Sequence, residues 1–131
     1  MNQIRAKVKE IQTEQNLTIV SFAFGGYTLK MMGLELDPSI QVGSEVILTS
    51  KATSLGLAKD FEGVLSYSNM LKATIVELEN GVLLSSVKLA CEDMSLESII
   101  TKDSALRMDL REGEEITVLI KASELSILEV L

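Results

Sequence analysis

The sequence contains no histidine and no tryptophan, and it has only one cysteine and one proline. Without histidine, the chain lacks the most common general base and the most common transition-metal ligand. It also has no nucleophile–base pair, no glycine-rich phosphate loop and no metal-ligand spacing. We therefore expect a protein that is not an enzyme and needs neither a metal ion nor an organic cofactor. The lone Cys91 lies in an apolar segment, which predicts a buried, inert thiol.

Long hydrophobic runs are also missing, because no stretch approaches the roughly 18 apolar residues that a membrane span needs. The N-terminus does not have the pattern of a signal peptide, so we expect a cytoplasmic protein with no membrane partner. Aromatic residues make up 4% of the chain and the net charge is -7, with most of the acidic excess in residues 61–131. An acidic surface with few stacking rings disfavours nucleic acid as a partner.

The chain contains an internal repeat. Residues 2–11 match residues 69–78 at an offset of 67, and both segments begin with asparagine. Residues 40–57 match residues 110–127 at an offset of 70, with five of eighteen positions identical. The difference between the offsets implies a three-residue insertion in one connecting loop. We predict a tandem duplication, with one unit in residues 1–60 and the other in residues 61–131.

Each unit has the pattern of short strands. Apolar and polar residues alternate in residues 4–9, 87–91 and 116–120. Asn80-Gly81 is a strong hairpin signal, and further turns are expected at 14–16 and at Gly25-Gly26. A brief helix is expected from Lys102 to Met108, with a looser counterpart at 32–38. The predicted fold is all-β, with two tandem OB-like five-stranded barrels that each carry one short helical connector.

An ordered set of segments in the second unit resembles the Mop or TOBE domain family. The set comprises Ser66-Tyr67-Ser68-Asn69, Ile100-Thr101 with Ser104 following, Leu110-Arg111-Glu112-Gly113, and Lys121-Ala122-Ser123. The family includes the bacterial molbindins and the C-terminal half of the molybdate-responsive transcription regulator. The resemblance covers nearly the whole chain, more strongly in the second unit than in the first.

This resemblance implies OB-like barrels that associate into compact oligomers and hold molybdate or tungstate at contacts between domains. One domain then supplies the segment with Ser66 and Ser68, and a neighbour supplies Thr101 and the Lys121-Ala122-Ser123 segment. Molybdate is a dianion with four acceptor oxygens, so hydroxyls, backbone N–H groups and an ammonium group are suitable ligands. The anion-binding residues expected from the resemblance are Thr101, Lys121, Ala122, Ser123, Ser66, Ser68 and Ser104, with Lys51 and Thr53 in the first unit.

The first unit departs from this pattern. At the offset of 70, Met31 corresponds to Thr101 and Leu34 to Ser104, so both hydroxyls are lost. Met1 occupies the position of Ser68, and no donor-bearing segment precedes Asn2. We therefore expect the first unit to supply at most half a site. In the second unit, Ser68 occupies the position of the family's arginine, which removes a cation.

Each of these residues also has a structural interpretation. Lys51 and Lys121 would then be solvated charges at strand ends, Thr101 the N-cap of the short helix, and Ser66 and Ser68 plain linker residues. The expected function is storage, buffering or sensing of the oxyanion by a homo-oligomer. The alternative is a structural oligomerisation module with a degenerate anion site.

Overall fold

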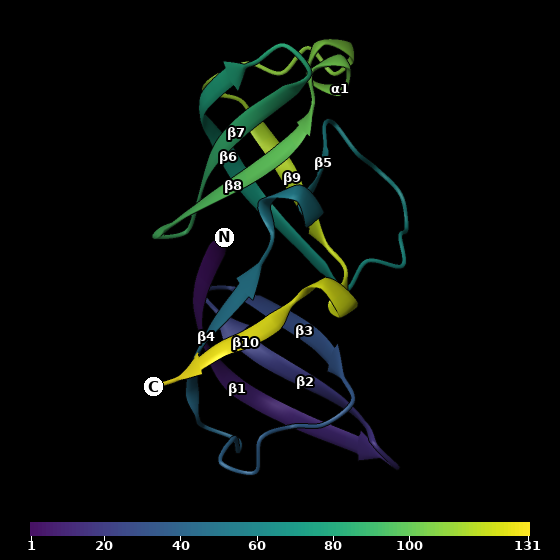
Figure 1. Ribbon diagram of the computed structural model, residues 1–131, viewed down its shortest axis with the longest axis vertical. Helices are drawn as coiled ribbons and strands as arrows, with labels where there is room; N and C mark the ends of the chain where they lie inside the picture. Colours follow the sequence, from purple (N-terminus) through teal and green to yellow (C-terminus); the bar gives the residue numbers. More distant parts are fainter.

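A computed structural model describes all 131 residues as two curled β-sheets stacked end to end (Figure 1). The elements follow in the order β1 (Asn2–Glu14), β2 (Leu17–Phe24), β3 (Tyr27–Gly33), β4 (Glu45–Ser50), η1 (Ala52–Ser54), β5 (Gly56–Ala58), β6 (Asn69–Asn80), β7 (Leu84–Cys91), β8 (Met94–Thr101), α1 (Lys102–Arg107), β9 (Glu115–Ile120), η2 (Ala122–Glu124) and β10 (Ser126–Val130). The two η elements are single 3-10 turns. No helix is long and apolar enough to cross a membrane.

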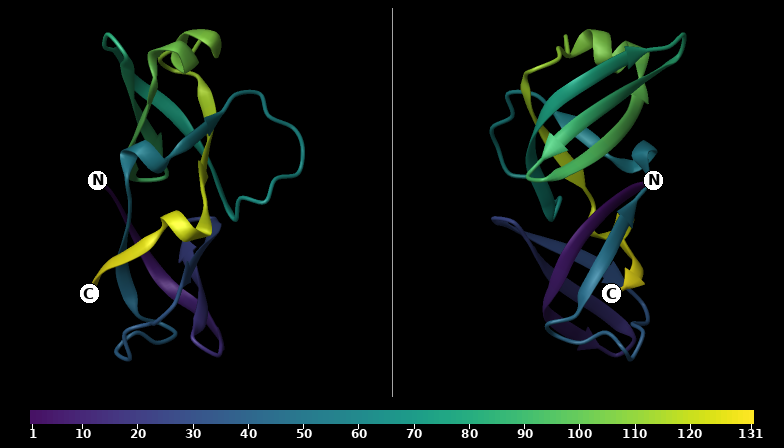
Figure 2. Two further views of the ribbon diagram at one scale, coloured as in Figure 1. Left: turned by 45° about the vertical axis from the view of Figure 1, so that its right-hand side comes forward. Right: turned by 90° about the vertical axis from the view of Figure 1, so that its left-hand side faces the viewer.

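The two sheets exchange their last strands. Barrel one is the sheet with strand order β10-β4-β1-β2-β3, and barrel two is the sheet with order β5-β9-β6-β7-β8. β5 belongs to the first unit of the sequence but pairs with β9, and β10 belongs to the second unit but pairs with β4. Both crossings are visible where the chain passes between the barrels (Figure 2). The units 1–60 and 61–131 therefore describe the repeat in the sequence, whereas each sheet draws one strand from the other unit.

Alternation along the first strand of each unit explains why these segments form sheet. In β1, Ile4, Ala6 and Val8 are buried while the basic residues between them are exposed. β6 has the same burial pattern at the same positions. Because successive side chains point to opposite faces of a strand, each segment covers a core with one face and meets solvent with the other. The buried residues of both barrels form one continuous cluster.

The same backbone contacts occur in both units before β4 and β9. The N–H of Gly43 donates to the carbonyl of Val8 at 2.8 Å, and the N–H of Gly113 donates to the carbonyl of Ile75 at 2.7 Å. Both glycines have a positive φ, of 95° and 89°, which L-residues rarely adopt. These positive φ angles explain why glycine occupies the turn before β4 and the turn before β9.

The connectors between the third and fourth strands differ. In barrel two the expected helix is present as α1, whereas residues 34–44 of barrel one contain bends and turns but no helix. The strand pairing Ser85–Ile100 corresponds to Thr18–Gly33, which keeps the offset at 67 through β3 and β8. Leu34, not Met31, is therefore the counterpart of Thr101, and Ser104 lies in the connector that carries the insertion. Met31 corresponds instead to Ser98.

Cys91 is a buried core residue with 1% of its surface exposed, as expected. Burial raises the pKa of its thiol, and the charge of Glu92 adds to this effect. Because the thiolate is the reactive species, we expect native Cys91 to react with a disulfide reagent at least about 100-fold more slowly than in denaturant. Spectrophotometric thiol titration with and without urea measures this ratio, and equal rates would contradict it.

Candidate functional site

Two equivalent turns lie where the barrels meet. Turn one (Lys51–Ser54) follows β4, and turn two (Lys121–Glu124) follows β9. The lysines that begin them have nearly the same backbone angles, with φ of -69° and -68° and ψ of 141° and 145°. In each turn the N–H of the fourth residue donates to the lysine carbonyl at 2.9 Å. The first N–H groups of such a turn have no acceptor within it, so they are available to an anion.

A buried asparagine holds each turn region against the other barrel. The side chain of Asn69 donates to the carbonyl of Lys30 on β3 at 2.9 Å and accepts from its N–H at 2.7 Å. Asn2 makes the equivalent pair with Glu97 on β8, at 2.9 and 2.7 Å. Asn69 is fully buried and Asn2 is 5% exposed. Each asparagine amide thus makes the same pair of hydrogen bonds with the opposite sheet that a neighbouring strand would make.

The asparagines are the structural residues that sequence reasoning missed. Their signal was present, because the two repeats both begin with asparagine at the first strand position. What the alternation could not indicate is the partner, which lies 39 residues away for Asn69 and 95 residues away for Asn2. Their role in the site is to position the turns, since Asn2 pairs with Ser50 and Asn69 pairs with Ile120, directly before each lysine.

The structure brings part of the expected site together beside turn two. Ser68 immediately precedes Asn69, which pairs with Ile120, so the antiparallel register places Ser68 next to Lys121. Lys121, Ser123 and Ser68 are exposed, and Ala122 is half-buried. Ser66 lies two residues further back, exposed in the loop that leads into β6. Neither Lys121 nor Lys51 takes part in any ion pair, so both ammonium groups are free.

Thr101 and Ser104 lie together, but in a different place. Thr101 is the N-cap of α1, and its hydroxyl oxygen accepts from the N–H of Ser104 at 3.1 Å. The two hydroxyls are also within hydrogen-bond distance, at 2.9 Å. The capping interpretation of Thr101 is therefore correct, and it leaves the threonine exposed at the surface.

The two groups are at opposite ends of barrel two. Turn two lies beside Asn69, the first residue of β6, because Asn69 pairs with Ile120. Thr101 lies near Asn80, the last residue of β6, because Asn80 pairs with Ser85 and Ser85 pairs with Ile100. Eleven residue steps of about 3.3 Å separate the two ends of β6, or about 36 Å along the strand. Figure 1 shows α1 at one end of the molecule and the turn before β10 near its middle. No single ion can touch both groups within one chain.

In barrel one the equivalent site has fewer hydrogen-bond donors. Turn one retains Lys51 and the exposed Thr53, and Met1 lies at the position of Ser68. Leu34, 67% exposed, stands where barrel two has Thr101. This turn therefore offers an ammonium group, one hydroxyl and backbone N–H groups, without the second pair of hydroxyls.

Comparison with known proteins adds independent information. The family model for the TOBE domain matches residues 65–127. The structure is similar to that of the cytoplasmic molybdate-binding protein ModG, determined with molybdate bound, with a TM-score of 0.90 and 27% identity over 96% of this chain and 94% of that chain. It is also similar to a molybdate-binding protein from Sporomusa ovata, with a TM-score of 0.50 and 31% identity over 51% of this chain and 100% of that chain. A search of curated proteins gave no significant match.

Proposed function

Because this chain belongs to the TOBE-domain family, with two Mop-like units in tandem, we propose that it is a non-enzymatic binding protein for molybdate. The observation that carries the proposal is the similarity to ModG, which extends over both barrels rather than over one module. The shorter protein from Sporomusa ovata is covered completely by half of this chain, which supports a binding unit that has been duplicated.

The proposed ligands fall into two sets. Turn two supplies the ammonium group of Lys121, the backbone N–H of Ala122 and the hydroxyl of Ser123, with Ser68 beside them and Ser66 nearby. Thr101 and Ser104 supply the second set from the N-terminal turn of α1. Hydrogen bonds to a charged acceptor contribute about 1.5–3 kcal/mol each, so several together offset the desolvation of a dianion.

These two sets meet only if a second copy of the chain brings its α1 to turn two. Their separation along β6 is the basis for proposing a homo-oligomer with anion sites between copies. Lys51 and Thr53 of turn one form a weaker half-site of the same kind. Tungstate has the same shape and charge as molybdate, so we propose that it binds as well. Storage, buffering or sensing in the cytoplasm fits such a protein, without an organic cofactor or a nucleic-acid partner.

Thermal unfolding with added oxyanions tests this function. A ligand that binds only the folded state stabilises it by about 2.7 kcal/mol at a hundred times its Kd. We expect molybdate and tungstate to raise the melting temperature by several degrees, and sulfate and phosphate to do so less. Calorimetry gives the stoichiometry. An unchanged midpoint at millimolar molybdate would favour the structural oligomerisation module instead.

Lys121→Ala is expected to abolish the molybdate-induced shift while leaving the midpoint of the free protein nearly unchanged. The reason is that the side chain is exposed and makes no ion pair, so its removal costs the fold little. Lys7→Ala is the matched control, because Lys7 is an exposed strand lysine outside both turns. Loss of the folded state in Lys121→Ala would mean that the residue has a structural role.

A further inference from the structure

Each barrel has a seam between its two edge strands. In barrel two the edge strands are β5 and β8, and in barrel one they are β10 and β3. The residues on the two seams correspond through the repeat, so that Leu55 beside the barrel-two seam matches Leu125 in barrel one. A register shift in β10 then places Glu129 opposite Ile47, where barrel two has Ala58 opposite Thr117. The two seams nevertheless differ in how they are closed.

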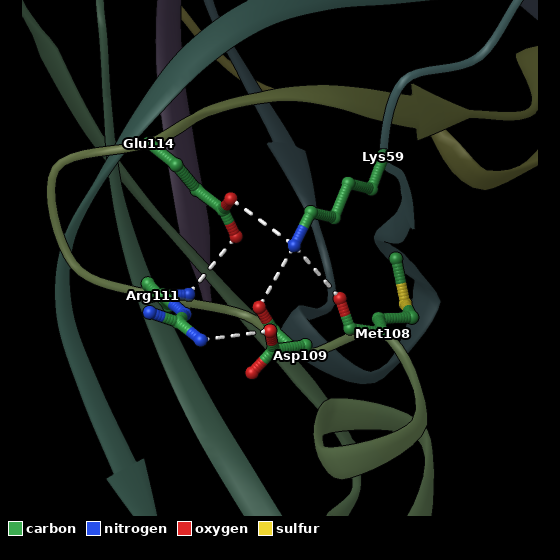
Figure 3. A network of polar contacts seen from close by, with 5 residues as sticks. All are labelled: Lys59, Met108, Asp109, Arg111 and Glu114. Carbon is green, nitrogen blue, oxygen red and sulfur yellow. Dashed lines mark hydrogen bonds and ion pairs between the residues drawn. The ribbon is translucent and has the colours of Figure 1, made fainter.

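Polar contacts close the seam of barrel two. The hydroxyl of Ser98 on β8 donates to the carbonyl of Leu55 at 2.7 Å. Lys59, directly after β5, donates to the carbonyls of Met108 and Asp109 at 3.0 and 2.8 Å and pairs with Glu114 at 3.2 Å (Figure 3). Both side chains of this ion pair are only 24% exposed. The end of α1 is thereby tied to the exchanged strand.

None of these contacts has an equivalent in barrel one. Met31 replaces Ser98, Val130 lies at the ladder position of Lys59, and the connector forms no helix. The result is an open groove of about 420 Å³ between β3 and β10, which we call the seam groove. Its floor contains the buried side chains of Met31, Ile40 and Leu125.

The rim of the seam groove carries charge of one sign. Glu35, Asp37 and Glu129 line it, and no lysine or arginine does. Such a rim repels an oxyanion, so the groove itself is unsuited to molybdate, although Ser123 of turn two lies at its margin. The far edge of β10 has no neighbouring strand, and its backbone groups are available to one. Exposed Met32 and Leu128 extend the apolar surface to the groove's margin.

We propose that the seam groove binds an extended segment of another protein in which apolar and basic residues alternate. Its backbone pairs with the free edge of β10, as in strand addition to an open sheet edge. Its apolar side chains cover Met31, Ile40 and Leu125, and a lysine or arginine lies beside Glu129.

A labelled peptide tests the proposal with the full chain. The probe is a fluorescein-labelled octapeptide of alternating valine and lysine, and its counterpart has glutamate in place of lysine. Fluorescence anisotropy should show saturable binding of the lysine peptide and none of the glutamate peptide. In NMR spectra the amide signals of residues 126–130 should shift on binding.

The decisive variant is Glu129→Lys, which reverses one of the three negative charges on the groove rim. It should weaken peptide binding at least about tenfold, because an attractive pair becomes a repulsive one. Glu10→Lys is the control, since Glu10 is an exposed carboxylate on the same barrel outside the groove, and it should bind as the unaltered chain does. Folding of both variants is checked by circular dichroism.

Three results would overturn the proposal. The first is no binding of the lysine peptide at millimolar concentration, and the second is equal binding by Glu129→Lys. The third is a change of oligomeric state in Glu129→Lys, measured by sedimentation velocity, because a second copy would then occupy the groove. The first two results do not depend on molybdate binding, whereas the third does, because the proposed anion sites lie between copies.

Discussion

Removal of residues 126–131 is expected to unfold barrel one and to leave the sheet of barrel two complete. The deleted residues include β10, which pairs with β4 through Ser126–Thr49, Ile127–Leu48, Glu129–Ile47 and Val130–Val46. The N–H of Leu131 also donates to the carbonyl of Glu45. All strands of barrel two remain, because its edge strand β5 comes from the middle of the chain.

The expected loss is large compared with the stability of a small domain. Four or five backbone hydrogen bonds contribute about 1 kcal/mol each, and the half-buried Ile127 adds about 1 kcal/mol, for a total of roughly 5–6 kcal/mol. Small domains have unfolding free energies of about 5–15 kcal/mol. The core residues Val46 and Leu48, fully buried in the intact chain, would lie at an open sheet edge.

Amide hydrogen exchange distinguishes the two barrels. Protection should fall in β1 to β4 and persist in β6 to β9. Deletion of Leu131 alone is the control, and its expected cost is about 1 kcal/mol for one hydrogen bond. Preferential loss of protection in β6 to β9 would contradict the strand exchange.

Asn69→Ala is expected to destabilise the protein by about 3–4 kcal/mol. The substitution leaves the N–H and carbonyl of Lys30 without partners at a partly buried contact, next to the fully buried position of Asn69. Each unsatisfied buried group costs about 1–3 kcal/mol, and the lost side-chain volume adds a cavity. Asn2→Ala should have a similar effect through Glu97, which would show that the two asparagine contacts between the barrels are equivalent.

Urea unfolding measures this loss as a shift of the midpoint at constant slope. Asn16→Ala is the matched control, because Asn16 is exposed in a hairpin turn and makes no side-chain hydrogen bond. Its expected cost is below about 0.5 kcal/mol. If Asn69→Ala lowers the free energy of unfolding by less than about 1 kcal/mol, the hydrogen bonds between Asn69 and Lys30 contribute little to the contact between the barrels.

Much of the expected site could be found from residue types and order, but not its assembly. The Lys-Ala-Thr/Ser segments form equivalent turns. The expected grouping was wrong, because Ser68 lies beside Lys121 within one barrel and Thr101 lies at its other end. That Thr101, Ser104 and turn two form one site between copies stays a prediction. The sequence alignment placed Met31 opposite Thr101, which was wrong, because a gap position cannot be located within a stretch that lacks identical residues.

The sequence alone determined the repeat, the strands, the hairpin turns and the short helix of the second unit, because each depends on neighbouring residues: alternation sets the faces of a strand, and turns need particular backbone angles. Only the tertiary structure decided which barrel each last strand joins. Leu57 in β5 and Ile127 in β10 are both half-buried apolar residues at equivalent positions of the repeat, and each would fit the edge of either sheet. The choice depends on where the chain runs after turns one and two, and on long-range contacts such as those of Asn2, Asn69 and Lys59. Such contacts leave no periodic trace in the sequence.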